Sequence, residues 1–157
     1  MTATVRRAES PDDVAAVRGL FLDYLRFIED YLGQSLGFQG TEREFADFPQ
    51  TYHALWLGDV DGRPAGAVGL KQFDETRAEL KRLYVRPEGR GAGLGEALCR
   101  ACIEDATRRG YRTLLLDTDP GLVHANAIYE RLGFTDIARY YDNPMDSRFM
   151  ALELLPR

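Results

Sequence analysis

The hexapeptide Arg90-Gly91-Ala92-Gly93-Leu94-Gly95 joins a strand predicted over Arg77 to Arg86 to a helix predicted from Gly93 to Arg109. Glycines let backbone N–H groups approach a ligand closely, because no Cβ stands in the way. The start of a helix adds unpaired N–H donors and a partial positive charge. The hexapeptide therefore predicts a binding site for phosphate.

The spacing of the glycines narrows the kind of phosphate ligand. A dinucleotide-binding fingerprint would need glycine at position 96, where the chain has Glu96. A P-loop would need Gly-Lys followed by Ser or Thr, which the sequence lacks. A flexible glycine turn without a ligand is the remaining alternative, and it leaves the coincidence of Arg90 with a helix start unexplained.

The sequence on either side of the hexapeptide predicts a mixed α/β fold. Ser10 and Asp13 resemble a capping box, and Asp61-Gly62 is a strong hairpin signal because both turn positions need positive φ. The further predicted strands are Thr4 to Glu9, Ala54 to Val60, Pro64 to Gln72, Arg112 to Thr118, Phe134 to Arg139 and Arg148 to Leu154. The further predicted helices are Pro11 to Tyr31, Thr41 to Phe48 and Leu122 to Leu132. A meander followed by strand–helix–strand units predicts a mixed sheet with helices on its faces.

Composition limits the classes of protein to consider. The 157 residues suit one domain, and 45% hydrophobic with 29% charged residues is an ordinary globular balance. A formal charge of -5 predicts no general affinity for nucleic acid or anionic membranes. No apolar run approaches the roughly 20 residues of a membrane span, and no signal-peptide core is evident at the N-terminus. We therefore expect a single cytoplasmic domain over residues 1–157.

Cysteine and histidine give little evidence of a redox or metal site. Cys99 and Cys102 form a C-x-x-C motif, but the motif lies in the middle of a predicted helix rather than at its start, where the dipole would favour a thiolate. Helical spacing predicts that both side chains are core residues. His53 and His124 lack partners at metal-ligand spacing, so no metal is expected.

Two separated motifs resemble those of the GNAT family of N-acetyltransferases. Residues 90–95 match the Q/R-x-x-G-x-G/A pyrophosphate loop, and Leu83-Tyr84-Val85 with Pro87 is similar to the family's fourth strand and its exit. The segment Ala125 to Phe134 is similar to the family's A-x-x-L-Y-x-x-L-G-F segment. The order of predicted elements agrees along nearly the whole chain. The resemblance implies a mixed, mostly antiparallel central sheet, splayed between its fourth and fifth strands, with helices on both faces.

The resemblance also implies acetyl-CoA as cosubstrate. Its pyrophosphate is expected at residues 90–95, namely Arg90, Gly91, Ala92, Gly93, Leu94 and Gly95, and its pantetheine along the backbone of Leu83, Tyr84 and Val85. Many members carry an asparagine seven residues before the motif tyrosine, and here Leu122 holds that position. Asn126, in the same segment, is included among the cofactor-binding candidates.

The family's reaction implies an amine that attacks the thioester directly in a ternary complex. A backbone N–H near Leu83 or Tyr84 would stabilise the oxyanion. Tyr129 would protonate the departing thiolate, since a reference phenol pKa near 10 makes that transfer to a thiolate feasible. The alternative for Tyr129 is packing beside Leu132 and Phe134.

The attacking amine must lose a proton, and two carboxylates are candidates to accept it. Glu79 is expected on the side of its strand shared by Lys81, Leu83 and Val85, because side chains alternate along a strand. The alternative for Glu79 is a surface ion pair with Lys81 or Arg77. Asp117 is the competing base, although the turn residues that follow it predict local hydrogen bonds that would occupy its carboxylate.

The acceptor and the partners are less defined by the sequence. Tyr140, Tyr141 and Asp142 precede the last strand and are candidate substrate contacts. The expected partner is a small-molecule or peptide amine, with a homodimer left open. A noncatalytic acyl-CoA sensor and a nucleotide-binding domain are the rival functions; two candidate bases favour the enzyme, and the missing Gly-Lys-Ser/Thr disfavours the nucleotide-binding domain.

Overall fold

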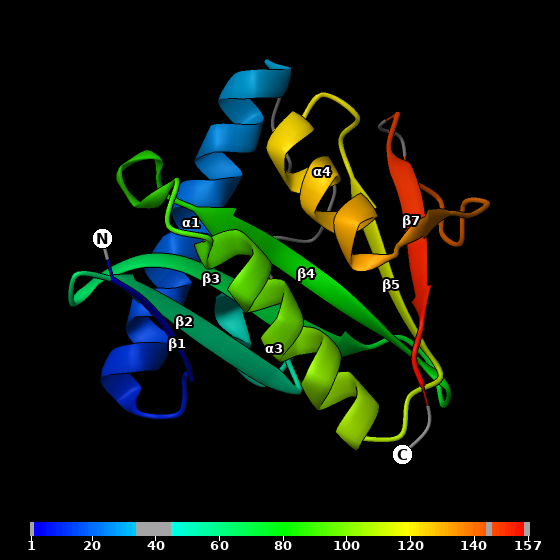
Figure 1. Cartoon of the computed structure of the whole chain (residues 1–157), viewed down its shortest axis with the longest axis horizontal. Helices are drawn as coiled ribbons and strands as arrows, with labels where there is room; N and C mark the ends of the chain where they lie inside the picture. Colours follow the sequence, from blue (N-terminus) through cyan, green and yellow to red (C-terminus); the bar gives the residue numbers. More distant parts are fainter. Residues whose placement is uncertain (1, 34–44, 144–145, 156–157) are drawn as a thin grey trace.

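The computed structural model describes residues 2–33, 45–143 and 146–155. Figure 1 shows a central sheet with helices in front of it and behind it. The strands are β1 (Ala3–Arg7), β2 (Ala54–Val60), β3 (Arg63–Gln72), β4 (Arg77–Val85), β5 (Thr113–Thr118), β6 (Thr135–Asp136) and β7 (Arg148–Glu153). The helices are α1 (Pro11–Leu32) behind the sheet, α3 (Leu94–Arg108) and α4 (Val123–Leu132) in front, and the short 3₁₀ helix η2 (Pro87–Gly89). The predicted mixed α/β fold is confirmed.

The sheet has seven strands in the order β1-β2-β3-β4-β5-β7-β6. Every neighbouring pair is antiparallel except β4 and β5, which run parallel. Pairing between β4 and β5 stops at Glu79 and Leu115, although both strands continue. Figure 1 shows the two strands close together at one end and diverging toward the other. The predicted splay between the fourth and fifth strands is therefore present.

Several local signals are realised as the sequence predicts. The Ser10 side chain accepts a hydrogen bond from the Asp13 backbone N–H at 3.1 Å and caps α1. Asp61 and Gly62 both have positive φ in the β2–β3 turn. The predicted strand over 134–139 is wrong in length, because only Thr135 and Asp136 pair with β7. Most of the helix predicted over 41–48 lies outside the described residues, and only 45–46 of its described part is helical.

The position of α3 depends on two glycines in the sheet. Leu94, the first residue of α3, is fully buried and packs directly on Gly58 and Gly66. A Cβ at Gly58 would lie 2.5 Å from the Leu94 side chain, and one at Gly66 would lie 3.1 Å from it. Both distances are shorter than ordinary van der Waals contact, so the absent side chains let the start of α3 sit close to the sheet. This close approach fixes the position of residues 90–95, called the glycine loop below, at the start of α3.

A β-bulge changes the direction of the side chains along β4. Arg82 has φ of 62°, and the pairing with β3 shifts register between Ala67 and Gly69. One extra residue in a strand reverses the alternation beyond it. Leu80 and Leu83 consequently both pack into the core beneath α3. Tyr84 instead faces α1.

The bulge corrects one expectation about the candidate base. Strand alternation predicts that Glu79 shares a face with Leu83 and Val85, but those two residues pack on the α3 side together with Ala78 and Leu80. Glu79 alternates with Ala78 and Leu80 and therefore lies on the opposite face, which α1 and the segment before β7 flank. The alternation rule fails here because it assumes a strand without an inserted residue.

Candidate active site

The glycine loop presents backbone donors at the start of α3. Gly91 and Gly93 have φ of 91° and 75°, and Gly93 is the N-terminal cap of the helix without a side-chain capping bond. The first intrahelical bond runs from the Ala97 N–H to the Gly93 carbonyl. The N–H groups of Leu94, Gly95 and Glu96 therefore have no partner within the helix. These donors, with exposed Arg90 beside them, are suited to an anion such as a phosphate group.

The strands β4 and β5 diverge next to this loop, because η2 links the end of β4 to it. Beyond Glu79, no strand in the described part of the chain pairs with the edge of β4 that faces β5, so this edge of Leu83 to Val85 is not used in the sheet. Leu83 and Val85 pack beneath α3, while Tyr84 contacts Tyr24 of α1 at 5.9 Å between ring centroids. The backbone groups predicted to bind a chain-like ligand thus have one unpaired edge.

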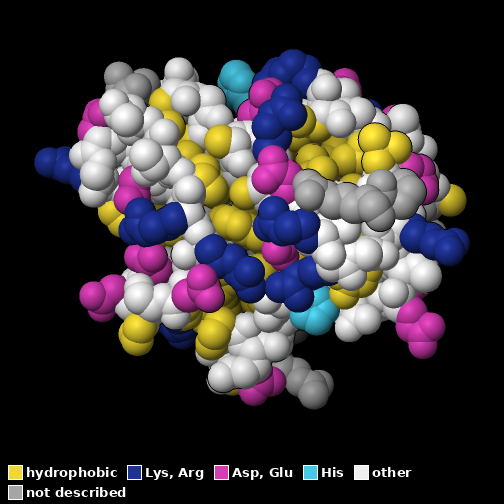
Figure 2. Space-filling view, turned by 60° about the horizontal axis from the view of Figure 1, so that its bottom comes forward, with side chains coloured by type: hydrophobic (Ala, Val, Ile, Leu, Met, Phe, Trp, Pro, Cys, Tyr) yellow, Lys and Arg dark blue, Asp and Glu magenta, His cyan; other side chains and the backbone are white. Residues whose placement is uncertain are grey.

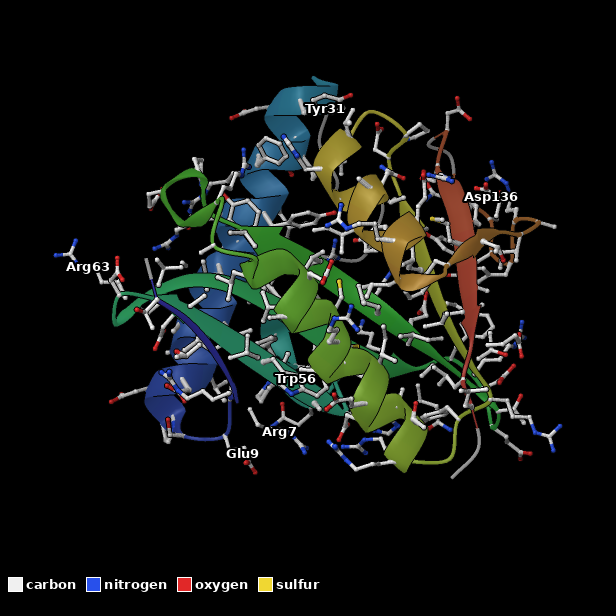
Figure 3. All side chains as sticks on the ribbon, in the orientation of Figure 1. Arg7, Glu9, Tyr31, Trp56, Arg63 and Asp136 are labelled. Atoms are coloured by element: carbon white, nitrogen blue, oxygen red, sulfur yellow. The ribbon has the colours of Figure 1, made fainter. Side chains whose placement is uncertain are left out.

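The end of α1 reaches across to the turn that follows β5. Figure 3 shows Tyr31 at the upper end of α1, near the start of α4. Its hydroxyl lies where a Cβ at Gly121 would stand, so a side chain there would displace the Tyr31 ring. Leu122 packs against the Leu25 and Ile28 pair of α1. The end of α1 therefore lies beside the diverging strands β4 and β5, on the side of the sheet that carries Glu79.

Both candidate bases lie together on that side, Glu79 on β4 and Asp117 on β5. The Lys81 Nζ is 3.4 Å from Asp117 Oδ1 and 3.8 Å from Glu79 Oε2. Glu79 is buried, and the Asp117 side chain is only 13% exposed. The surface ion pair considered for Glu79 is therefore realised only as a loose contact with Lys81, inside the site rather than on the open surface.

Two tyrosines from the segment before β7 hold these carboxylates. The Tyr140 hydroxyl donates to Glu79 Oε2 at 2.8 Å, and the Tyr141 hydroxyl donates to Asp117 Oδ2 at 2.7 Å. Asn143 Nδ2 adds contacts to Asp117 Oδ2 at 3.4 Å and to the Tyr141 hydroxyl at 2.9 Å. Burial and the neighbouring carboxylates raise the pKa of both phenols well above the ordinary value, so the phenols remain donors.

The expected local hydrogen bonds of Asp117 are not the ones observed. Asp117 is engaged by Tyr141, Asn143 and Lys81, whereas Asp119 makes the turn hydrogen bond, accepting from the Gly121 N–H at 2.8 Å. Sequence reasoning assigned Tyr140 and Tyr141 only to substrate contact and missed their bonds to the carboxylates. Nothing in the local sequence pairs residues 61 and 24 positions apart.

Comparison with known proteins supplies the family. A family model described as "Acetyltransferase (GNAT) family" matches residues 23–134, which is more than half of the chain. The chain belongs to the GNAT acetyltransferase family. An uncharacterised N-acetyltransferase of Schizosaccharomyces pombe is 34% identical to this GNAT protein, over 84% of this chain and 87% of the relative. Human N-acetylaspartate synthetase is 33% identical over 76% of this chain, which spans only 40% of that longer protein.

Solved structures agree with the GNAT fold. A GNAT acetyltransferase of Staphylococcus aureus superposes with a TM-score of 0.79 at 16% identity, covering 98% of this chain and all of the other. The yncA protein of Salmonella typhimurium, solved with its cofactor acetyl-CoA, superposes with a TM-score of 0.69 at 19% identity, covering 100% and 96% of the two chains. At these identities the likeness establishes the fold alone.

The GNAT motif tyrosine, Tyr129, lies buried in α4. Its ring packs edge-on against Phe134 at 5.8 Å between centroids, as the packing alternative expects. Burial raises the pKa of Tyr129 well above 10, and the charges of Cys99, Tyr24 and Asp117 act in the same direction. In the described part of the chain no group hydrogen-bonds its hydroxyl. Packing therefore accounts for the ring but not for the hydroxyl.

Asn126, the other candidate in this GNAT segment, uses its amide within the chain. Nδ2 donates to the carbonyls of Asp119 at 2.9 Å and Leu122 at 2.7 Å, and Oδ1 accepts from Arg148 at 3.0 Å. These bonds tie the turn after β5 to the start of α4 and to β7. None of these three partners belongs to residues 90–95.

Cys99 and Cys102 are fully buried on α3, as the helical spacing predicts. Burial raises the pKa of Cys99 to about 12 and that of Cys102 well above its usual value. His53 contacts the Tyr111 hydroxyl at 2.9 Å. Over residues 2–33, 45–143 and 146–155, no three His, Cys, Asp or Glu side chains are grouped to hold a metal ion, and no helix has the length and apolarity to cross a bilayer.

Proposed function

We propose that the protein transfers the acetyl group of acetyl-CoA to the primary amine of an acceptor by direct attack in a ternary complex. Acetyl-CoA supplies a thioester, whose acyl carbon is open to attack by an amine. The proposal is supported by family membership, by the acetyl-CoA in the Salmonella neighbour and by the fit of the loop to a pyrophosphate. The N-acetylaspartate synthetase among the relatives indicates an amino acid as one kind of acceptor in the family.

The glycine loop and β4 would hold the cosubstrate. The N–H groups at the start of α3 and the Arg90 guanidinium would bind the pyrophosphate, since both present positive charge to it. The open backbone edge of Leu83 to Val85 would bind the pantetheine amides. The N–H of Leu83 or Tyr84 would donate to the thioester oxygen as it becomes negative, a contribution typically worth about 100-fold or more in rate.

Glu79 is the better candidate for the base. Asp117 accepts hydrogen bonds from Tyr141, Asn143 and Lys81, so its oxygens are largely occupied. Glu79 accepts one from Tyr140 on Oε2, and among the described residues nothing hydrogen-bonds its Oε1. That oxygen is able to take a proton from the amine, directly or through a water. Tyr129 would give its hydroxyl proton to the departing sulfur.

The observation that carries the proposal is the glycine loop opening α3 beside the unpaired edge of β4. Its test is Gly93→Ala. Gly93 has positive φ and no atom within 4 Å of where its Cβ would stand, so the added methyl meets no protein atom but projects toward the predicted phosphate site. We expect CoA to bind at least tenfold more weakly to a folded Gly93→Ala protein.

Gly110→Ala is the matched control for this test. Gly110 also has positive φ and open space around its Cβ, but it lies at the other end of α3. Both variants should therefore lose about 1 kcal/mol of stability from the left-handed backbone. Calorimetric titration with CoA would contradict the proposal if Gly93→Ala bound as tightly as Gly110→Ala.

A further inference from the structure

The charge arrangement beside the candidate base bears on the acceptor. Lys81 and Lys71 are the only lysines of a chain that carries 20 basic residues, and both lie beside Glu79. Lys71 is the residue opposite Glu79 on β3, and its Nζ lies 4.8 Å from the centre of the Tyr52 ring. The Lys81 Nζ instead lies between the two carboxylates and 5.9 Å from the centre of the Tyr141 ring.

Lys81 is held more loosely than the carboxylates themselves. Its contacts of 3.4 and 3.8 Å are longer than the 2.7 to 2.9 Å that is typical of a charge-assisted hydrogen bond. The phenol bonds to Glu79 and Asp117 have normal short distances of 2.8 and 2.7 Å. The carboxylates are thus fixed from the tyrosine side, whereas a 21% exposed ammonium with three N–H donors is able to bind a further anion.

Two other cations of this part of the chain, Arg77 and Arg86, pair with other acids. Arg86 donates to Asp23 through both Nε and Nη2, at 3.2 and 2.8 Å. Arg77 pairs with Asp74 at 2.7 Å. Lys81 itself contacts both candidate bases.

The spacing of these charges matches one class of amine. In a free α-amino acid, the ammonium and the carboxylate are bonded to the same carbon. A site for it needs a cation directly beside the acids that receive the ammonium, as Lys81 stands beside Glu79 and Asp117. A plain alkyl amine, a lysine side chain in a protein or the N-terminus of a peptide has no carboxylate at that distance and gives Lys81 no partner.

We propose that the acceptor is a free α-amino acid whose carboxylate is bound by Lys81 while Glu79 and Asp117 face its ammonium. This inference rests on the proposed acetyltransferase function and makes Lys81 a residue that determines acceptor specificity. The packing of Tyr140 against Phe73 and Phe149, each at 5.1 Å between ring centroids, keeps the carboxylate side of the site rigid.

The test compares acceptors that differ only in the carboxylate. Alanine with ethylamine, leucine with isoamylamine, phenylalanine with phenethylamine and histidine with histamine are assayed with acetyl-CoA by release of the CoA thiol. A short peptide with the same N-terminal residue is included for each pair. We expect at least one amino acid to exceed its decarboxylated partner and its peptide by tenfold or more in kcat/KM.

Lys81→Met should remove this preference. We expect kcat/KM for the amino acid to fall about 10- to 100-fold, mainly through an increase in KM. A loss of this size corresponds to one hydrogen bond to a charged group. The decarboxylated partner should change little, and Lys81→Arg should retain part of the preference. Lys71→Met is the matched control and should affect both members of a pair equally.

Two results would overturn the inference. If in every pair the decarboxylated amine or the peptide matches the amino acid, or if Lys81→Met affects both members of every pair equally, the α-amino acid is rejected while the transferase function stays in place. No thiol release above the acceptor-free rate with any acceptor, in a protein that binds CoA, would reject the transferase function together with the inference.

Discussion

Replacing Glu79 by glutamine tests the candidate base with little disturbance of the fold. The amide oxygen that Glu79→Gln introduces would still accept the Tyr140 hydroxyl, which now lies 2.8 Å from Glu79 Oε2. The contact with Lys81 is long at 3.8 Å, and Lys81 keeps Asp117 as a partner at 3.4 Å, so its loss should cost about 1 kcal/mol of stability. A fall in activity beyond that therefore reports on catalysis.

The size and pH dependence of the effect follow from the chemistry of the amine. General base catalysis typically contributes about 100-fold or more, so kcat/KM of Glu79→Gln should fall by about that factor at pH 7. A chain-terminal α-amino group has a pKa near 8, and the carboxylate of a free amino acid raises the pKa of its own ammonium further. Little of the acceptor is therefore neutral at pH 7, and below the pKa the neutral fraction rises about tenfold with each pH unit. Because the neutral amine needs no base, the deficit should shrink steadily as the pH rises.

The assay is thiol release at saturating acetyl-CoA from pH 6.5 to 9.5, with Asp117→Asn measured in parallel. Asp117 bridges Lys81, Tyr141 and Asn143, so its amide variant should act through local structure and show a deficit nearly independent of pH. A pH-dependent deficit in Asp117→Asn, with a constant one in Glu79→Gln, would refute this assignment and make Asp117 the base.

The directions of the pKa shifts yield three further predictions. Because burial raises the pKa of Tyr129 well above 10, its hydroxyl stays protonated through pH 10. Tyr129→Phe should therefore lower kcat by up to about 100-fold, and the factor should be constant from pH 7 to 10. Activity equal to that of the parent protein would leave Tyr129 with a packing role only. Burial keeps Cys99 and Cys102 protonated, so native protein should resist thiol alkylation at pH 8, and fast labelling would contradict their burial. Burial alone would raise the pKa of Asp105, but the hydrogen bonds and charges of Arg109, Arg108 and Arg7 together outweigh it and lower the pKa. A lowered carboxyl pKa stabilises the fold above about pH 4 and loses that effect as the pH falls, so Asp105→Asn should cost about 1 to 3 kcal/mol at pH 7 and weaken the acid dependence seen in urea titrations.

Asp105 also shows how charge is distributed around the end of α3. Arg109 and Arg108 lie 2.6 and 3.2 Å from its carboxylate, and Arg7 lies 3.9 Å from it. Figure 2, in which the bottom of the view in Figure 1 is turned forward, shows basic side chains interleaved with acidic ones. This cluster ties the end of α3 to β1 and accounts for the prediction that Asp105 contributes to stability.

Much of this fold is determined by interactions between residues close in sequence. Ser10 caps α1 through a residue three positions away, and Asp61-Gly62 supplies the two positive φ angles of the β2–β3 turn. Gly93 caps α3 at the point where the chain enters the helix. Helical spacing alone is enough to predict that Cys99 and Cys102 are buried. Capping, turn geometry and helical periodicity depend on neighbouring residues, so the sequence predicts them directly.

The active-site arrangement depends on contacts between distant residues. Pairing of β4 with β5 ends at Glu79, and no local pattern marks that position. The bonds from Tyr140 to Glu79 and from Tyr141 to Asp117 form only when the segment before β7 folds over the sheet. Sequence periodicity contains no information on which distant groups such a segment meets.

The bulge at Arg82 is the clearest case. A regular strand predicts that Glu79 and Leu83 share a face, and the register shift against β3 puts them on opposite faces. Side-chain direction beyond a bulge depends on how one strand pairs with another, which is a property of the assembled sheet. The sequence by itself therefore determined most helices and strands, the glycine loop and the identity of the candidate groups. The tertiary structure decided on which face of the sheet each group lies.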